Sequence, residues 1–318
     1  MPLRWLRTLL MAAATFGLLA CAAATSGREA QAVRALALAE GVYWLPGSGG
    51  VADANNLGRI GNAGFIVGDN GVIAIDTGTS FAHGQALLAA IRAITDKPIR
   101  MALITHARPE FLFGAAAYRA QGIPIRTHLQ TARLMAARCE TCLKTLRQTL
   151  GDAPMQGTEV VKPDQTFEAS HQLADIGRPV RVLNFGHSSG PGDIAVLDVK
   201  SGVLFAGGLA DVQRIPDIQD SDLPGWHRAL AELRKLPLRQ IVPGHGPAAP
   251  ASALEAVQNY LDALEARAQA LVAQGRSLIE VPDASGLPRF ESWDQYETIH
   301  RRNASIAFLR AERVLMLK

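Results

Sequence analysis

Three histidines each follow a short apolar run with the composition of a β-strand. They are His106 after residues 101–105, His187 after residues 180–186, and His245 after residues 240–244. Open sheets place ligand-binding side chains at strand ends, so three such imidazoles can converge on one metal ion. Histidine is a usual ligand of zinc, and a catalytic zinc keeps one position open for water. The spacing therefore predicts a metal site built from separate strand ends.

The order and surroundings of these histidines resemble the metallo-β-lactamase superfamily. That family carries the signature HxHxDH after a strand, and the corresponding loop here reads His106-Ala107-Arg108-Pro109-Glu110-Phe111. Arg108 and Phe111 stand where the second and third histidines of the signature would be, and Glu110 replaces its aspartate. Arginine keeps its proton and phenylalanine has no lone pair. The resemblance therefore implies a site that lacks two of the family's ligands.

The later parts of the family pattern are better preserved. His187 and His245 match its later histidine ligands, and Asp76-Thr77-Gly78 matches another signature, whereas Gly208 stands where a bridging aspartate usually lies. The resemblance covers about residue 41 to the end of the chain. It implies an α+β protein with the four-layer αββα metallo-β-lactamase sandwich, in which two sheets lie face to face and helices cover them.

One interpretation of the site keeps a metal. Four candidate ligands remain, His106, Glu110, His187 and His245, with Glu110 also the candidate catalytic carboxylate. In the family each of two metal pockets takes three ligands, so this set implies one zinc ion at most. A metal-held water would attack the carbonyl of a small ester, lactone or thioester.

The other interpretation has no metal. Here the permanent charge of Arg108 replaces the charge of the metal and forks to Glu110 through two charge-assisted hydrogen bonds. Phe111 fills the volume that the metal would take. The chain would then be a catalytically inactive protein that binds a ligand or partner.

Under either interpretation, the chain most resembles the branch of the superfamily called quinoprotein relay system metallohydrolases. The features that carry this resemblance are an export signal, a helix with a CxxC pair, and residues 206–209 and 214–217.

The N-terminus is typical of an export signal. Arg4 and Arg7 precede an apolar run over residues 8–20, which is too short to span a bilayer, and Cys21 with three alanines follows. Two outcomes stay open. The signal is cleaved near residues 22–24, or Cys21 is acylated, since Leu18-Leu19-Ala20-Cys21 resembles a bacterial lipoprotein box. Either way we expect a periplasmic protein, which acylation would attach to the membrane.

Length and composition indicate a globular chain with a large core. It has 318 residues, of which 48% are hydrophobic and 19% charged, and this excludes disordered and fibrous classes. We expect residues 1–24 to be the signal and residues 35–318 to be the metallo-β-lactamase-like domain with its C-terminal helices. The net charge of +3 becomes +1 without the two arginines of the signal, too little for a nucleic-acid partner. The expected partner is a small-molecule substrate or ligand.

Two further cysteines, Cys139 and Cys142, form a CxxC pair in a segment with helical periodicity. In an oxidising compartment this spacing predicts a structural disulfide or a redox pair. A zinc knuckle would need two more soft ligands, which the sequence lacks.

The remaining pattern predicts alternating strands and helices. A hairpin over residues 64–78 turns at Asn70-Gly71, and a helix with Leu87, Leu88, Ile91 and Ile94 on one face ends before Pro98. Further helices are expected at 114–120, 131–150, around Trp226, and from Leu254 to Leu271. Further strands are expected at 123–126, 180–185, 194–198, 203–206 and 241–242.

Overall fold

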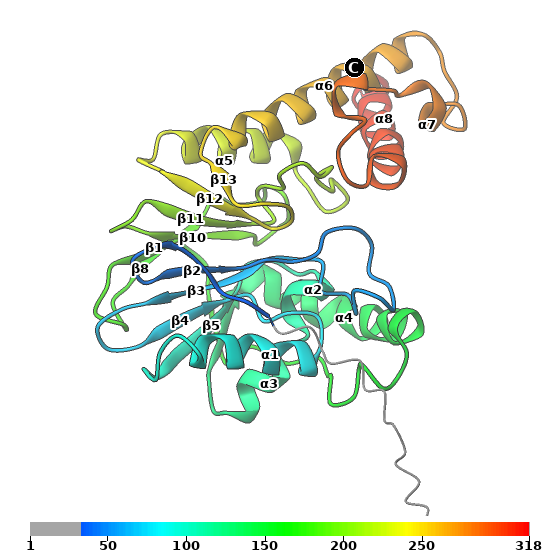
Figure 1. Ribbon diagram of the computed structural model, residues 1–318. Helices are drawn as coiled ribbons and strands as arrows, with labels where there is room; N and C mark the ends of the chain where they lie inside the picture. The colour runs from blue at the N-terminus through cyan, green and yellow to red at the C-terminus, as the bar shows by residue number, and fades with distance from the viewer. Residues whose placement is uncertain (1–32, 318) are drawn as a thin grey trace, which may run out of the picture. The chain divides into compact units, whose positions relative to one another are not determined.

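Two β-sheets lie face to face in the computed structural model, which describes residues 33–317 (Figure 1). The first sheet follows sequence order: β1 (Leu36–Ala39), β2 (Val42–Leu45), β3 (Ala63–Val67), β4 (Val72–Ile75), β5 (Ile99–Ile104), β6 (Ile125–His128) and β7 (Gln165–Phe167). The second runs β13-β12-β11-β10-β9-β8, with β8 (His171–Leu173), β9 (Val180–Asn184), β10 (Ile194–Asp198), β11 (Val203–Gly207), β12 (Gln240–Pro243) and β13 (Ala249–Pro250). Both sheets combine antiparallel and parallel neighbours.

The predicted hairpin forms at the expected turn. Val67 at the end of β3 pairs with Val72 at the start of β4, so Asn70 and Gly71 lie in the connection. β4 then pairs in parallel with β5, and the crossover between them contains the helix α1 (Phe81–Arg92). This helix is shorter than predicted. It ends at Arg92, and Ile94 lies beyond it with 42% of its surface exposed, so the apolar spacing overstated the helix by about one turn.

Helices cover the outer faces of both sheets and complete the predicted αββα sandwich (Figure 1). On the side of the first sheet lie α1, α2 (Pro109–Leu112), α3 (Ala115–Ala120) and α4 (Leu129–Leu150). On the side of the second lie α5 (Leu223–Arg234), α6 (Ala253–Ala273), α7 (Val281–Ala284) and α8 (Arg301–Met316). A 3-10 turn at Pro288–Phe290 and a π-helical turn at Tyr296–His300 join α7 to α8.

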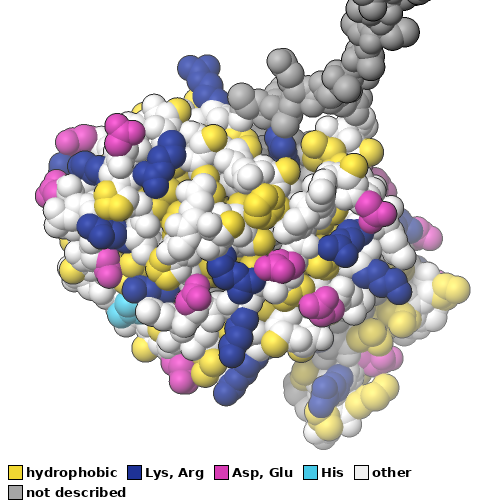
Figure 2. Space-filling view, turned by 90° about the horizontal axis from the view of Figure 1, so that it is seen from below, with side chains coloured by type: hydrophobic (Ala, Val, Ile, Leu, Met, Phe, Trp, Pro, Cys, Tyr) yellow, Lys and Arg dark blue, Asp and Glu magenta, His cyan; other side chains and the backbone are white. Residues whose placement is uncertain are grey.

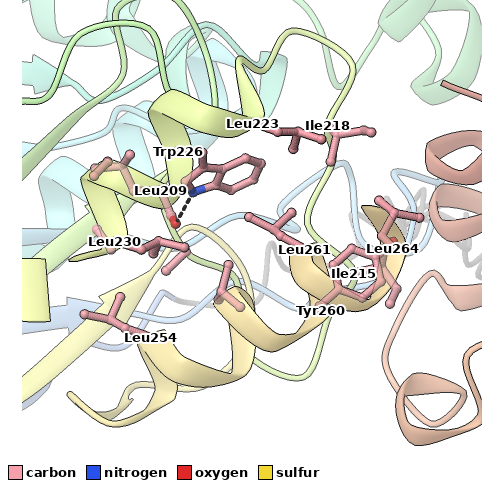
Figure 3. Close-up of a cluster of buried hydrophobic side chains, with 14 of the residues drawn as sticks. Leu209, Ile215, Ile218, Leu223, Trp226, Leu230, Leu254, Tyr260, Leu261 and Leu264 are labelled. Carbon is pink, nitrogen blue, oxygen red and sulfur yellow. Dashed lines mark hydrogen bonds between the residues drawn. The ribbon is translucent and has the colours of Figure 1, made fainter. Parts of the chain in front are cut away.

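The interior consists of three apolar layers. Between the sheets lie side chains such as Ile66, Met101 and Val182, all fully buried. The layer between the second sheet and its helices is centred on Trp226, whose indole nitrogen donates to the carbonyl oxygen of Leu209 at 2.9 Å (Figure 3). That bond satisfies the one polar atom of the largest buried side chain. The third layer packs α1, α3 and α4 on the first sheet.

Within residues 33–317, no helix is both long and apolar enough to cross a bilayer. The expected signal over residues 1–24 and the expected acylation site Cys21 lie outside the described residues.

On the face seen in Figure 2, basic and acidic side chains are interspersed rather than gathered by sign.

Candidate active site at the strand ends

All three predicted histidines do follow strands, but the structure treats them differently. His106 follows β5 in the first sheet and His245 follows β12 in the second, and both are almost fully buried, with 3% and 5% of their surface exposed. His187 follows β9 and is exposed. Two of the three imidazoles therefore reach the interior at the strand ends.

A chain of hydrogen bonds holds His106 in place. The backbone N–H of Thr105 donates to Asp76 Oδ1 at 2.8 Å, and the Thr105 hydroxyl also donates to that carboxylate. The hydroxyl oxygen also lies 2.8 Å from Nδ1 of His106. Burial, followed by the charge of Arg108, lowers the pKa of His106 to about 3, so the imidazole is neutral. Burial raises the pKa of Asp76 to about 8.

His245 has acidic partners on both sides of its ring. Its Nδ1 lies 2.9 Å from Asp211 Oδ1, and its Nε2 lies 3.0 Å from Glu110 Oε1. Burial alone would lower the pKa of His245, but the charge of Asp211 and the bonds to both carboxylates outweigh it and raise the pKa. Burial acts against ionised Glu110, yet the bond and charge of His245 bring its pKa to about 2. The three groups form a buried, hydrogen-bonded triad.

Phe111 packs against both buried histidines. Its ring centroid lies 4.2 Å from that of His106 and 5.2 Å from that of His245, and none of its surface is exposed. Gly61 has no side chain and so leaves space for this ring, because a Cβ at position 61 would lie 2.5 Å from Phe111 Cζ. The aromatic ring is thus a fixed part of the strand-end interior.

Arg108 pairs with a residue that the sequence did not suggest. Its Nη1 donates to Asp217 Oδ2 at 2.7 Å, and Arg302 donates to the same oxygen at 2.5 Å. The predicted fork from Arg108 to Glu110 is wrong. Glu110 faces His245 from the first turn of α2, and Asp217, only 8% exposed, offers the guanidinium its carboxylate instead.

His187 is turned out of this group. Its Nε2 lies 2.7 Å from the carbonyl oxygen of Asp220. It is absent from the cavity lining that includes His106, Arg108, Glu110, Asp193, Gly208, Asp211, Asp217 and His245. The structure therefore brings together three of the four predicted ligands, His106, Glu110 and His245, and separates His187 from them.

Comparison with known proteins agrees with this architecture. The sequence model of the metallo-beta-lactamase superfamily matches residues 57–245. The chain belongs to that superfamily. Its fold is similar to a metallo-beta-lactamase from Pontibacter korlensis, with a TM-score of 0.59 and 22% identity over 72% of this chain and 99% of that one. It is also similar to FIM-1 from Pseudomonas aeruginosa in a mono-zinc form, with a TM-score of 0.56 and 23% identity over 72% and 95% of the two chains. The αββα metallo-β-lactamase sandwich predicted from the sequence is confirmed.

A curated relative matches this chain over less than half of its own length. A linear primary-alkylsulfatase from Pseudomonas sp. (strain ATCC 19151) is 24% identical over an alignment of 230 positions that covers 62% of this chain. The aligned region spans 43% of that enzyme's length. This superfamily member therefore resembles part of the alkylsulfatase rather than the whole of it.

Members of the superfamily typically bind zinc, and the donors described above do not fit a resident zinc ion as they stand. Within residues 33–317, the group of three His, Cys, Asp or Glu side chains with ligand atoms within 4.8 Å of one another is His227, Asp262 and Glu265, away from these strand ends. Both nitrogens of His245 face carboxylates, and a guanidinium lines the cavity. The cavity measures about 40 Å³, which is room for a few waters, whereas ligand pockets usually exceed roughly 300 Å³.

Three acidic residues of this superfamily member were missed by the sequence reasoning: Asp193, Asp211 and Asp217. Asp193 receives a bond from the Ser189 hydroxyl at 2.7 Å, and burial raises its pKa to about 6. Its carboxylate also occupies the space beside Gly208, where a Cβ would lie 2.6 Å from Asp193 Oδ2. Asp193 directly precedes β10, and Asp211 lies four residues past β11, so their strand-end positions were a usable signal.

The CxxC pair is not a disulfide in the structure. Cys139 and Cys142 are free thiols on α4, Cys139 buried and Cys142 partly exposed. Helical residues three apart have Cβ atoms about 5–6 Å apart, whereas a disulfide needs about 3.5–4.5 Å. A regular helix through both residues therefore disfavours the predicted bond.

Proposed function

We propose that this protein is a metal-free member of the metallo-β-lactamase superfamily that acts by binding rather than by hydrolysis. The proposal rests first on Phe111, whose buried ring contacts both His106 and His245. An aromatic ring offers no lone pair to a metal and excludes water from the surfaces that it covers. Phe111, at the position of a family ligand, therefore contributes to the packing of the interior instead of binding a metal.

Charge supports the same conclusion. Arg108, with 32% of its side chain exposed, places a permanent cation at the cavity, and its partner Asp217 neutralises it. His245 is held between Asp211 and Glu110, and both of its ring nitrogens face a carboxylate. A divalent cation would meet repulsion from Arg108, and His245 and Glu110 would have to give up their existing hydrogen bonds to bind it. The internal ion pairs take over the electrostatic role that a metal would have.

A one-metal hydrolase is the second candidate. The observation in its favour is that His106, Glu110 and His245 line one cavity together with Asp193 and Asp211, so several donors are near each other. The small cavity and the outward position of His187 weigh against this candidate and against a small ester, lactone or thioester as substrate.

We propose in addition that the chain is exported and works in the periplasm, released by cleavage or attached through acylated Cys21. The support is the pattern of residues 1–21. Placement in the branch of quinoprotein relay system metallohydrolases is likewise our proposal, supported by that signal and by residues 206–217. The near-neutral net charge that remains without Arg4 and Arg7 favours a partner other than nucleic acid.

The test is metal content, measured by elemental mass spectrometry on protein purified without chelator from zinc-supplemented cells. An Arg108→His/Phe111→His double variant is measured in parallel. We expect essentially no zinc in the native protein and one zinc per chain in the double variant, because the two substitutions return imidazoles to family positions.

An Arg119→His variant controls for an added imidazole, since Arg119 pairs with Glu159 on the exposed surface. It should remain free of zinc. One zinc per native chain would refute the metal-free proposal and favour the hydrolase. A double variant that folds, as judged by circular dichroism, yet binds no zinc would show that Arg108 and Phe111 are not what excludes the metal.

A further inference from the structure

The end of the last helix is unusually apolar for a solvent-exposed surface. Residues 314–317, here called the α8 tip, are Val314, Leu315, Met316 and Leu317, with 57%, 62%, 76% and 78% of their surface exposed. Single exposed apolar residues are common, but consecutive ones of this size usually mark a surface that another molecule covers.

A groove lies directly beside the α8 tip. Its volume is about 580 Å³, and its walls come from the start of α5, the end of α6 and the last turns of α8. Apolar lining residues include Leu223, Pro224, Val272, Ala311, Val314 and Leu315. Val314 and Leu315 thus belong to both the tip and the groove, so the two features form one continuous apolar surface.

The groove contains two carboxylates and one arginine, whereas the charged residue beside the tip is basic. Asp222 and Glu265 line the groove, with 41% and 32% of their side chains exposed. Arg310, also in the groove, donates hydrogen bonds to the Ser221 hydroxyl oxygen and the Ile218 carbonyl oxygen, each at 3.1 Å. Arg313, immediately before the tip, is exposed. A tip that entered such a groove would bring Arg313 near carboxylates.

We propose that this surface is a self-association site, in which the α8 tip of one copy lies in the groove of a second copy. Because tip and groove are adjacent on each chain, a two-fold axis beside α8 lets both copies make the same contact at once. Each copy buries its four exposed tip residues, and each Arg313 approaches the partner's Asp222 and Glu265. The interface pairs an apolar centre with a charged rim.

A membrane surface fits this feature less well. Anionic lipid attracts clusters of basic residues. Asp222 already lies 3.7 Å from Arg228, and Glu265 lies 2.5 Å from His227. Both carboxylates flank the apolar surface and would be repelled by anionic headgroups, while in a dimer Arg313 of the second copy adds to their partners. The carboxylates at the groove therefore select for a protein partner with a basic, apolar helix end, and this chain carries one.

The test is the molar mass of the full chain by light scattering and sedimentation between about 1 and 100 μM, the range for a micromolar dissociation constant. We expect a shift from one to two chain masses. Leu315→Glu, at the groove, should abolish the shift. Leu309→Glu is the matched control, since Leu309 is exposed on α8 but outside the groove lining, and it should dimerise like the wild type.

Charge variants test the pairing. Arg313→Glu and Asp222→Asn should each weaken dimerisation severalfold, and the double variant should lose less than the product of the two effects. Asparagine retains the oxygen with which Asp222 caps α5, so the helix start is preserved. A wild type that stays monomeric throughout the range, or dimers that persist in Leu315→Glu, would overturn the proposal. A monomer that sediments with anionic vesicles would also overturn it, in favour of a lipid surface.

Discussion

The loop after β5 and the loop after β9 contrast family resemblance with local structure. The first departs from the family signature at Arg108 and Phe111, yet it reaches inward and supplies buried contacts at the strand ends. The second keeps the family histidine, yet that side chain, His187, is exposed and bonds to a backbone carbonyl. The loop after β9 keeps its family residue, but that residue lies outside the site.

A retained motif residue keeps its place in the site only where its hydrogen-bond partners are also present. His106 is held by Thr105, and His245 by Asp211 and Glu110, so each ring has neighbours that determine its position. His187 differs from these two histidines, because its Nε2 lies 2.7 Å from the backbone carbonyl oxygen of Asp220. Partners, rather than the identity of the residue, decide which imidazole is part of the interior.

Truncation of one residue from each loop tests the comparison most strongly. Phe111→Ala should lower the free energy of unfolding by about 3–5 kcal/mol, because it leaves a cavity between two buried histidines. His187→Ala should change it by less than about 0.5 kcal/mol, as for an ordinary surface substitution. Urea denaturation of both variants measures the contrast. Equal losses in the two variants would mean that the β9 loop is as structural as the β5 loop.

The fold could be predicted from the sequence because strands and helices depend on patterns that are local. Short apolar runs located β9, β10 and β12, and the Asn70-Gly71 turn located the β3–β4 hairpin, all near their observed bounds. Helix α1 was overestimated because the apolar spacing continues to Ile94 although the chain turns away.

The site could be predicted only in part, because its contacts join distant segments. The pairing of Arg108 with Asp217 spans 109 positions, and that of His245 with Glu110 spans 135. Nothing local distinguishes Asp217 from Glu110 as the partner of Arg108. The side-chain direction of His187 likewise depends on where the Asp220 backbone lies, which the motif around it does not encode.

Neutralising the partner of Arg108 should have the next largest effect. Burial alone would raise the pKa of Asp217, but the charges of Arg108 and Arg302 and its hydrogen bonds lower it. A carboxyl whose folded pKa is lowered stabilises the fold above its unfolded value of about 3.9 and loses that contribution as the pH falls. Asp217→Asn should therefore cost about 1.5–3 kcal/mol at pH 7 and progressively less below about pH 4.

Unfolding curves of wild type and Asp217→Asn from pH 3 to pH 8 measure this effect. Asp96→Asn is a control on the exposed surface and should show a small difference throughout. A cost for Asp217→Asn that does not change with pH would mean that the β5 loop is held by the shape of the residue and not by its charge.

Gly208 sharpens the comparison from the side of the family's missing aspartate. Gly208→Asp should destabilise the fold by about 1–3 kcal/mol, since its Cβ would lie 2.6 Å from Asp193 Oδ2 and 3.0 Å from His106 Cδ2. Asp193→Gly in the same chain removes that carboxylate. The combined variant should therefore be more stable than the sum of the two single effects predicts, with a coupling of about 0.5–3 kcal/mol. Additive effects would show that Asp193 does not take the space of the missing side chain.

We expect the smallest effect at the CxxC pair on α4, where two residues of one motif again differ in their surroundings. Burial raises the pKa of Cys139 to about 12, while Cys142 is partly exposed, so one motif contains two different thiols. Cys142→Ser should change the free energy of unfolding by less than about 0.5 kcal/mol. A maleimide pulse on the native protein, mapped by mass spectrometry of the α4 peptide, should label Cys142 first and Cys139 only on unfolding. Equal labelling of both thiols in the native state would mean that α4 opens there, and failure of both to react without a reductant would restore the disulfide.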